Sequence, residues 1–214
     1  MKKTKLWKNV LIIVGIILII VVLFVLRKFF ILSNLEEISK NTLNYKNYYA
    51  ELHTLQGDSV TIRKSYNKNS KYLTITEFYG MNIEENKKIT IYKNGEERIG
   101  KIQSGENKIA ILNQDMVGGL IGINAYATYG MDFWAKLQLA ITARITEEEC
   151  LSKNCYLIES AHGWKMWVDK ETGLIIREIN GGIVTDYNYI FDYVTDEDIR
   201  KPDISDCKIQ EKIN

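Results

Sequence analysis

Hydrophobic residues are distributed in two very different ways along this chain of 214 residues. Residues 10–26 form one unbroken apolar run, VLIIVGIILIIVVLFVL, without a charged or polar side chain. At about 1.5 Å per residue, a helix of this length approaches the thickness of the hydrocarbon core of a bilayer. After residue 32, apolar residues instead alternate with polar ones in short stretches bounded by turn-forming residues, which is typical of β-strands.

Turn-forming pairs divide this second region into strands. Asn94-Gly95 is the strongest hairpin signal, because both residues tolerate the positive φ angles of a type I′ turn, and Gly57-Asp58 lies between two further strand-like stretches.

We interpret the acidic run 147–149 as a solvated loop and 196–198 as the cap of a last helical turn. Strands are predicted at 48–56, 59–66, 70–79, 87–93, 96–103, 108–113, 155–160, 163–169, 173–179 and 182–195.

Helical spacing occurs in two places outside the apolar run. Residues 33–45 begin with capping-type residues and predict a short helix that leads into the domain, and 131–142 predict a second helix. Many strands joined by tight turns, with few helices between them, indicate an α+β fold built on one antiparallel sheet. We therefore expect a cytoplasmic tip and transmembrane helix at 1–32, followed by a β-rich extracytoplasmic domain at 33–214.

The flanks of the apolar run indicate how it is used. Four lysines precede it, Arg27 and Lys28 follow it, and the first 32 residues contain no acid. The positive-inside rule then places the N-terminus in the cytoplasm and the domain outside a cell membrane that the chain crosses once. A cleaved signal peptide begins in the same way, but no small-residue cleavage pattern and no lipoprotein-type cysteine follows, which favours an uncleaved signal-anchor.

Charge excludes one class of partner. Six of the 28 basic residues lie in the first 32 positions, so the remaining 22 face 27 acids and the later region has a formal charge near −5. Recognition of nucleic acid depends on clustered Lys and Arg that neutralise phosphates, so we expect no nucleic-acid partner. Abundant Ile, Lys and Asn beside a single proline are common in proteins from AT-rich bacterial genomes.

Motifs for catalysis or cofactor binding are missing from the sequence. The two histidines lie outside metal-binding spacings such as HExxH, and no GxSxG or phosphate-binding loop occurs, so we expect no enzyme, cofactor or metal. Cys150 and Cys155 flank a turn-like tetrapeptide, which leaves open a disulfide across a short hairpin or two free thiols. Two thiols without neighbouring histidines fall short of the four ligands of a structural zinc.

The remaining distinctive residues are apolar or aromatic. Trp164, Met166 and Val168 alternate onto one face of a strand, with Trp167 on the other. This face is either an ordinary core under the sheet or the wall of a hydrophobic pocket that holds an acyl chain. The glycine-rich segment 116–130 fits a plug, a lid or a contact with the bilayer. The candidate ligand-binding residues are Met116, Leu120, Tyr126, Phe133, Trp134, Trp164 and Met166.

A strand ending in Trp167-Val168-Asp169, a turn Lys170-Glu171-Thr172-Gly173 and a strand from Leu174 through Arg177 occur in a distinctive order, followed by a strand at 186–194 and the segment 199–202. This order resembles the LolA/LolB-like superfamily of envelope proteins, which includes lipoprotein carriers. The resemblance covers about a quarter of the chain by motif. It implies a strongly curved antiparallel sheet, a half-barrel, with a few helices against its concave side and a hydrophobic cavity beneath them.

The chain departs from that family in having a transmembrane anchor where the family has a cleaved signal or a lipidated cysteine. It therefore resembles a membrane-anchored member of a Gram-positive-type host, working in place, more than a shuttling carrier. One hypothesis is a non-enzymatic, membrane-tethered envelope protein that binds a lipid or lipidated ligand in the concavity of its sheet. The other is a protein-interaction or regulatory module that controls an envelope enzyme or a cell-wall, sporulation or germination partner.

Overall fold

The computed structural model describes residues 2–80, 87–113 and 122–210, which form three helices and twelve strands. The helices are α1 (Lys2–Thr42), the 3₁₀ helix η1 (Tyr126–Tyr129) and α2 (Phe133–Thr142). The strands are β1 (Asn47–Gln56), β2 (Ser59–Lys68), β3 (Lys71–Tyr79), β4 (Lys87–Asn94), β5 (Glu97–Ser104), β6 (Asn107–Leu112), β7 (Arg144–Cys150), β8 (Lys153–Glu159), β9 (Lys165–Asp169), β10 (Ile175–Asn180), β11 (Ile183–Phe191) and β12 (Lys208–Gln210).

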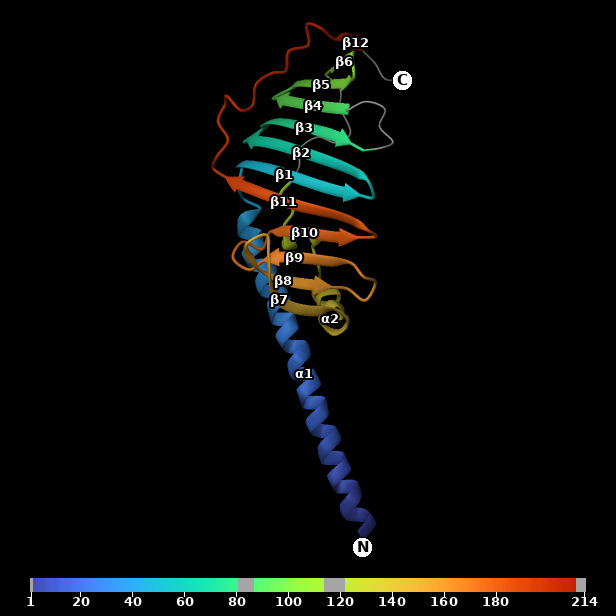
Figure 1. Ribbon diagram of the computed structural model, residues 1–214. Helices are drawn as coiled ribbons and strands as arrows, with labels where there is room; N and C mark the ends of the chain where they lie inside the picture. The colour runs from blue at the N-terminus through green and yellow to red at the C-terminus, as the bar shows by residue number, and fades with distance from the viewer. Residues whose placement is uncertain (1, 81–86, 114–121, 211–214) are drawn as a thin grey trace.

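The described strands form one open sheet in the order β12-β6-β5-β4-β3-β2-β1-β11-β10-β9-β8-β7 (Figure 1). Two meanders, β1 to β6 and β7 to β11, are joined by the antiparallel pairing of β1 with β11. Neighbouring strands are antiparallel, except that β12 runs parallel to β6. At about 4.8 Å per strand, the sheet extends roughly 50 Å from β7 to β12. The sheet does not close on itself, and the strong curvature of a half-barrel stays a prediction.

Local sequence signals account for most of these elements. The hairpin predicted between 87–93 and 96–103 is confirmed, but its turn lies one residue later than expected: Asn94 pairs with Glu97, so Gly95 and Glu96 form the loop. Gly95 has a φ of +61°, whereas Asn94 belongs to β4 and does not have the positive φ of a type I′ turn. The second helix is also confirmed, from Phe133 to Thr142. The interpretation of 147–149 as a loop was wrong: these residues lie in β7 and pair with β8. β7 is an edge strand, and charged side chains are common on edges because they discourage pairing with other chains.

Helix α1 crosses the predicted domain boundary at residue 32 without a break. The separate short helix expected at 33–45 is the last part of α1, because no proline or glycine interrupts residues 16–42. In Figure 1 the first half of α1 projects beyond β7, away from the sheet, and its second half lies against the β7–β11 meander. One helix is thus both the apolar segment and a core element of the domain.

The central core lies between the sheet and three segments on one of its faces, namely the second half of α1, η1 and α2. The buried residues of this cluster are Leu32, Leu35, Tyr126, Ala140, Ala143, Ile158, Met166, Val168 and Ile175. Lys136 of α2 forms an ion pair with Glu36 of α1, with Nζ to Oε2 at 2.7 Å, and holds the two helices together. Hydrogen bonds from Lys136 and Lys40 lower the pKa of Glu36.

The opposite face of the β1–β6 meander is covered by residues 192–207, which we name the C-terminal strap. Val194 and Ile199 of the strap pack in one cluster with Tyr49, Leu73 and other side chains of β1 to β5. Tyr48, the neighbour of Tyr49 in β1, pairs with Phe191, which contacts Tyr45 just after α1. Because adjacent residues of a strand point to opposite faces, the strap and α1 cover opposite faces of the sheet.

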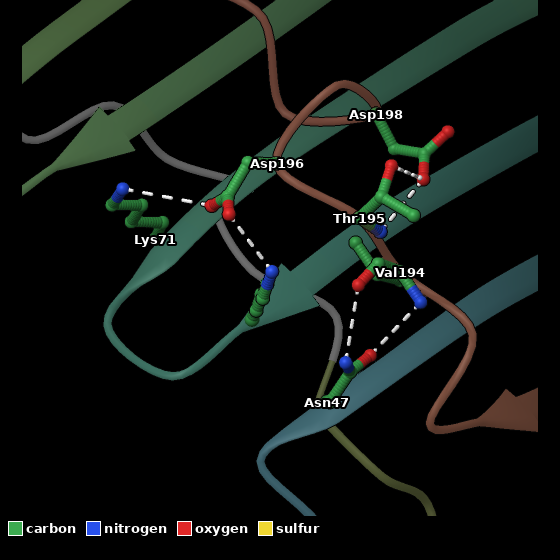
Figure 2. A network of polar contacts seen from close by, with 7 residues as sticks. Asn47, Lys71, Val194, Thr195, Asp196 and Asp198 are labelled. Atoms are coloured by element: carbon green, nitrogen blue, oxygen red, sulfur yellow. Dashed lines mark hydrogen bonds and ion pairs between the residues drawn. The ribbon is translucent and has the colours of Figure 1, made fainter.

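Polar contacts fix the beginning of the strap (Figure 2). The side-chain amide of Asn47 donates to the carbonyl of Val194 at 3.1 Å and accepts from its N–H at 2.9 Å. Lys68 and Lys71 of the β2–β3 hairpin form ion pairs with Asp196 at 2.9 and 3.6 Å. Residues 196–198 form a turn, so the helix cap predicted there was wrong: the Asp198 carboxylate accepts from the N–H and hydroxyl of Thr195 without a helix following.

Candidate functional site

The residues predicted to line one ligand pocket do not come together in the structure. Met116 and Leu120 lie outside the described residues. Tyr126 and Met166 are 2 % and 0 % exposed and pack in the central core with apolar side chains of α1. Helix α1 therefore occupies the space above these two positions, which favours an ordinary core there over a pocket for an acyl chain.

Trp164 is half-buried at the margin of this core, in a small polar cluster. Its indole N–H donates to Glu178 Oε1 at 2.7 Å, and the hydroxyl of Tyr187 donates to Oε2 of the same carboxylate at 3.3 Å. The ring of Tyr129 lies edge-on to Trp164 with centroids 5.6 Å apart. Burial raises the pKa of Tyr187 to about 12, so the phenol stays protonated and serves as a hydrogen-bond donor.

Phe133 and Trp134 lie in the first turn of α2, and both are exposed. The ring of Phe133 contacts Phe29 of α1 and Trp134, with centroids 5.3 Å apart in each pair. These two predicted residues therefore share a surface with α1 and not with the buried pair Tyr126 and Met166.

The two cysteines of the β7–β8 hairpin are free and buried. The register places Cys150 opposite Lys153 and Cys155 opposite Glu148, so the thiols occupy diagonal and not facing positions. Of the two interpretations left open by the sequence, the structure has the free thiols. Burial raises the pKa of Cys155 to about 12, which keeps this thiol protonated and unreactive at neutral pH.

A groove of about 450 Å³ lies between α1 and the β7–β8 hairpin, where the apolar run ends. We call it the juxtamembrane groove. Its walls are partly apolar, and two cationic residues of α1, Arg27 and Lys28, are among its lining residues. The lining residues are Phe24, Arg27, Lys28 and Ile31 of α1, Ile145, Thr146 and Glu147 of β7, and Tyr156 of β8.

Positive charge prevails in this groove. Arg27 is 3.9 Å from Glu147, and its side chain is 70 % exposed. Glu147 is also paired with Lys170, whose hydrogen bond lowers the pKa of the carboxyl, and the Lys170 ammonium lies 4.6 Å from the ring centroid of Tyr156. Lys28 donates to the carbonyl of Ala143 at 2.7 Å. Two cations, Arg27 and Lys170, are thus paired with one carboxylate. The Arg27 guanidinium is largely exposed and has further N–H groups that can donate to an anion.

A second groove, of about 590 Å³, lies at the other end of the domain half of α1. Ile38 and Tyr45 form its apolar side together with Phe191, and the polar side chains of Asn41 and Thr172 lie at its edge. Although it is larger, it contains a single charged residue, Glu171, among its lining side chains. The juxtamembrane groove combines apolar walls with positive charge, so it is the better candidate for a lipid-type ligand.

Sequence patterns indicated only part of the juxtamembrane groove. Arg27 and Lys28 were used as topology signals, and β7 was interpreted as a loop, so its wall residues Ile145 and Glu147 were not considered. The sequence signal for the α1 wall of this groove is the pair Arg27-Lys28 directly after the apolar run. The β7 wall could be found only from the sheet order, in which β7 is the edge strand.

No protein-family model matches this chain, and no curated protein matches it. Among solved structures, it is similar to an uncharacterized conserved protein from Thermus thermophilus, at 10 % sequence identity and a TM-score of 0.45. The similarity covers 85 % of this chain and 97 % of the other. At this TM-score the likeness carries no argument about the fold or the function.

Proposed function

We propose that this chain is a single-pass membrane protein of the cell envelope whose outer domain binds an anionic phospholipid in the juxtamembrane groove without catalysing a reaction. The N-terminus lies in the cytoplasm and the sheet lies outside. The proposal keeps the ligand class inferred from the sequence, a lipid, and moves its site from the concavity of the sheet to the place where α1 enters the domain. An affiliation with LolA/LolB-like proteins is part of this proposal and rests on the strand–turn–strand motif at 167–177.

The continuity of α1 supports an uncleaved anchor. Most of residues 10–26 are exposed on the described surface, and α1 is long and apolar enough to cross a membrane, a test that a signal sequence near the N-terminus also passes. However, the next turns already belong to the domain, since Phe29 contacts α2 and Leu32 is fully buried in the core. Cleavage behind the apolar run would cut the helix at its junction with the core.

The single observation that carries the lipid proposal is the location of the groove. Phe24 and Ile31 lie on the face of α1 that lines it, one on each side of Arg27 and Lys28. In a bilayer, the apolar end of this groove lies at the level of acyl chains and its cationic rim at the level of phosphates. Guanidinium groups bind phosphate through paired, charge-assisted hydrogen bonds, so Arg27 is the expected phosphate ligand.

Retention of lipid by the full chain tests this proposal. The protein is reconstituted with equal amounts of phosphatidylglycerol and phosphatidylcholine, released gently in detergent, and its bound lipids are counted by native mass spectrometry. We expect selective retention of phosphatidylglycerol, and a roughly tenfold loss of that retention in Arg27→Gln, because a charge-assisted hydrogen bond to a phosphate contributes more than about 1 kcal/mol.

Arg144→Gln is the matched control, because Arg144 is an exposed cation of β7 that does not line the groove. It should retain lipid like the wild type. Equal retention by Arg27→Gln and Arg144→Gln would refute the groove as the lipid site. In that case, recovery of one recurring envelope protein by crosslinking in cells would favour the interaction-module hypothesis over lipid binding.

A further inference from the structure

Helix α2 has an apolar side that the rest of the described structure leaves largely exposed. Phe133, Trp134 and Ile141 are 56 %, 72 % and 59 % exposed, and their spacing places them along one side of the helix. We call these three residues the outer face of α2. Large exposed aromatic residues gathered on one surface are unusual in soluble domains and mark a surface that meets another apolar phase.

The outer face is held in place by the packed side of the same helix, which lies opposite Trp134 and Ile141 and next to Phe133. Ala140 and Ala143 are buried in the central core, and the Lys136–Glu36 ion pair attaches the middle of α2 to α1. At the N-terminus, the Asp132 carboxylate accepts from the N–H of Ala135 at 2.7 Å and caps the helix. Because α2 is capped and packed in this way, its aromatic residues are presented outward by the fold and not by fraying.

Both ends of α2 contact α1 directly after the apolar run. The ring of Phe133 contacts that of Phe29 at an interplanar angle of 59°, and the carbonyl of Ala143 accepts from Lys28 at 2.7 Å. Lys28 and Phe29 lie two and three residues beyond Leu26, or about 3–5 Å along the helix axis. The polar layer on each side of a bilayer is about 5–7 Å thick. If α1 spans the membrane, α2 therefore lies at the depth of the lipid headgroups.

The chemistry of α2 suits that depth. Tryptophan concentrates at membrane interfaces, and an amphipathic helix that lies there turns an apolar side with Trp, Phe and other apolar residues toward the acyl chains. Between Asp132 and Ala143 the charged residues are Asp132 and Lys136, and both are engaged in the contacts described above. Phe30 of α1 is also 68 % exposed, and the ring contact of Phe133 with Phe29 joins the outer face to α1 directly after the apolar run. The surface is thus continuous with the apolar helix that enters the bilayer.

We infer that α2 is a second membrane contact: its outer face inserts into the outer leaflet beside α1. This inference rests on the proposed membrane anchoring and goes beyond lipid binding in the groove. A single span leaves a domain free to tilt and rotate, whereas two contacts fix the sheet with the β7 edge at the membrane and the β12 edge farthest from it (Figure 1).

Quenching of tryptophan fluorescence by lipids with brominated acyl chains tests the contact in the full chain reconstituted in vesicles. Four tryptophans are present, and Trp7, at the start of the apolar segment, reports insertion of α1 independently of Trp134. We expect Trp134→Phe to lower the quenchable emission by roughly half, because it removes one of two lipid-facing indoles. Trp167→Phe, which changes an indole on the other face of the sheet, should leave quenchable emission unchanged.

The outcomes separate the two proposals. If Trp7→Phe lowers quenching while Trp134→Phe has no effect, α1 is inserted and the membrane contact of α2 is refuted. If neither change lowers quenching, the membrane anchoring itself fails. Loss of Trp134 quenching at high protein-to-lipid ratio, together with a crosslinked dimer through α2, would assign the outer face to a second copy of this chain and overturn the inference.

Discussion

Gly173 shows how a single residue joins the domain to its helix. Its φ is +65°, and a Cβ built on it would lie 2.5 Å from Ser39 Cβ and 2.8 Å from Ser39 N, inside α1. The same turn is stabilised by Asp169, which accepts from the hydroxyl of Thr172 at 2.7 Å, while the Thr172 carbonyl accepts from Thr42 of α1 at 2.7 Å. The Asp–Lys–Glu–Thr–Gly sequence is thus a docking turn as well as a hairpin turn.

Replacement of Gly173 by alanine should destabilise the protein more than the backbone conformation alone requires. A left-handed alanine costs about 1–2 kcal/mol, and displacement of packed backbone adds about 1–3 kcal/mol. Gly181→Ala is the matched control, because Gly181 has a φ of +56° and open space around its Cβ position. Denaturation of the full chain in detergent, followed by tryptophan fluorescence, measures both. Equal losses would show that the approach to Ser39 is not what requires glycine at 173.

The sequence predicted this turn but not its partner. Asp169 and Gly173 are recognisable because capping carboxylates and positive φ angles are local requirements. That Ser39 lies against Gly173 is a tertiary fact, and no pattern in either segment encodes it. The same limit explains why the sequence left open whether Met166 lines a pocket or a core: alternation shows that one face of a strand is apolar, but packing of α1 determines whether that face is filled.

At the level of elements, the strap and β12 protect the outer edge of the sheet. β12 pairs with β6 over three residues, and the carboxylate of Asp206 in the strap forms ion pairs with Lys101 of β5 and Lys108 of β6. An uncovered edge strand is a template for pairing with other chains. We therefore interpret the strap as a cover for this edge, in contrast to β7, whose edge carries charged residues and lies nearest to α2.

The cover should loosen in acid. Hydrogen bonds from Lys108 and Lys101 hold the pKa of Asp206 below its ordinary value of 3.8. A lowered folded-state pKa contributes stability above the ordinary value that is lost as the pH falls toward the folded-state value. Asp206→Asn should reproduce this loss at neutral pH. We expect several-fold lower hydrogen-exchange protection of Lys208–Gln210 in that variant, measured on peptides of the full chain.

Glu106→Gln is the control for this experiment, because Glu106 is exposed in the neighbouring β5–β6 turn. Unchanged protection in Asp206→Asn would show that the three backbone pairs of β12 hold the strap without the ion pairs. Raised salt should act in the same direction as acid, since exposed pairs are screened.

Elements were predictable where their signals are local. Hairpins such as 87–103 were placed from one turn pair, and α2 from its apolar spacing. β7 was missed because three consecutive glutamates usually indicate a solvent-exposed loop. An edge strand also exposes many of its side chains to solvent, so it tolerates such a run. β12 was missed because three exposed residues contain too little pattern. The break expected in α1 at residue 32 followed a change from apolar to polar sequence, which alters what surrounds a helix but does not end it.

For the whole molecule, the proposed topology predicts which parts a reagent outside the cell can reach. Cys207 is partly exposed, whereas Cys150 and Cys155 are buried. A membrane-impermeant maleimide should label the full chain in intact cells, and Cys207→Ser should abolish the labelling. The intact mass of the protein should include residues 1–32. Labelling only after lysis would contradict the orientation, and a mass lower by the N-terminal segment would contradict the anchor.

The joint between the two meanders has a consequence for the order of synthesis. Asn47 and Val194, which bond to each other at this joint, are 147 positions apart in the chain. Helix α1 is made first, yet the strands on which it packs, β8 to β10, belong to the last third of the chain. Contacts between such distant segments form slowly. We therefore expect the first meander to assemble early, while Leu32 and Leu35 of α1 stay uncovered until translation is nearly complete.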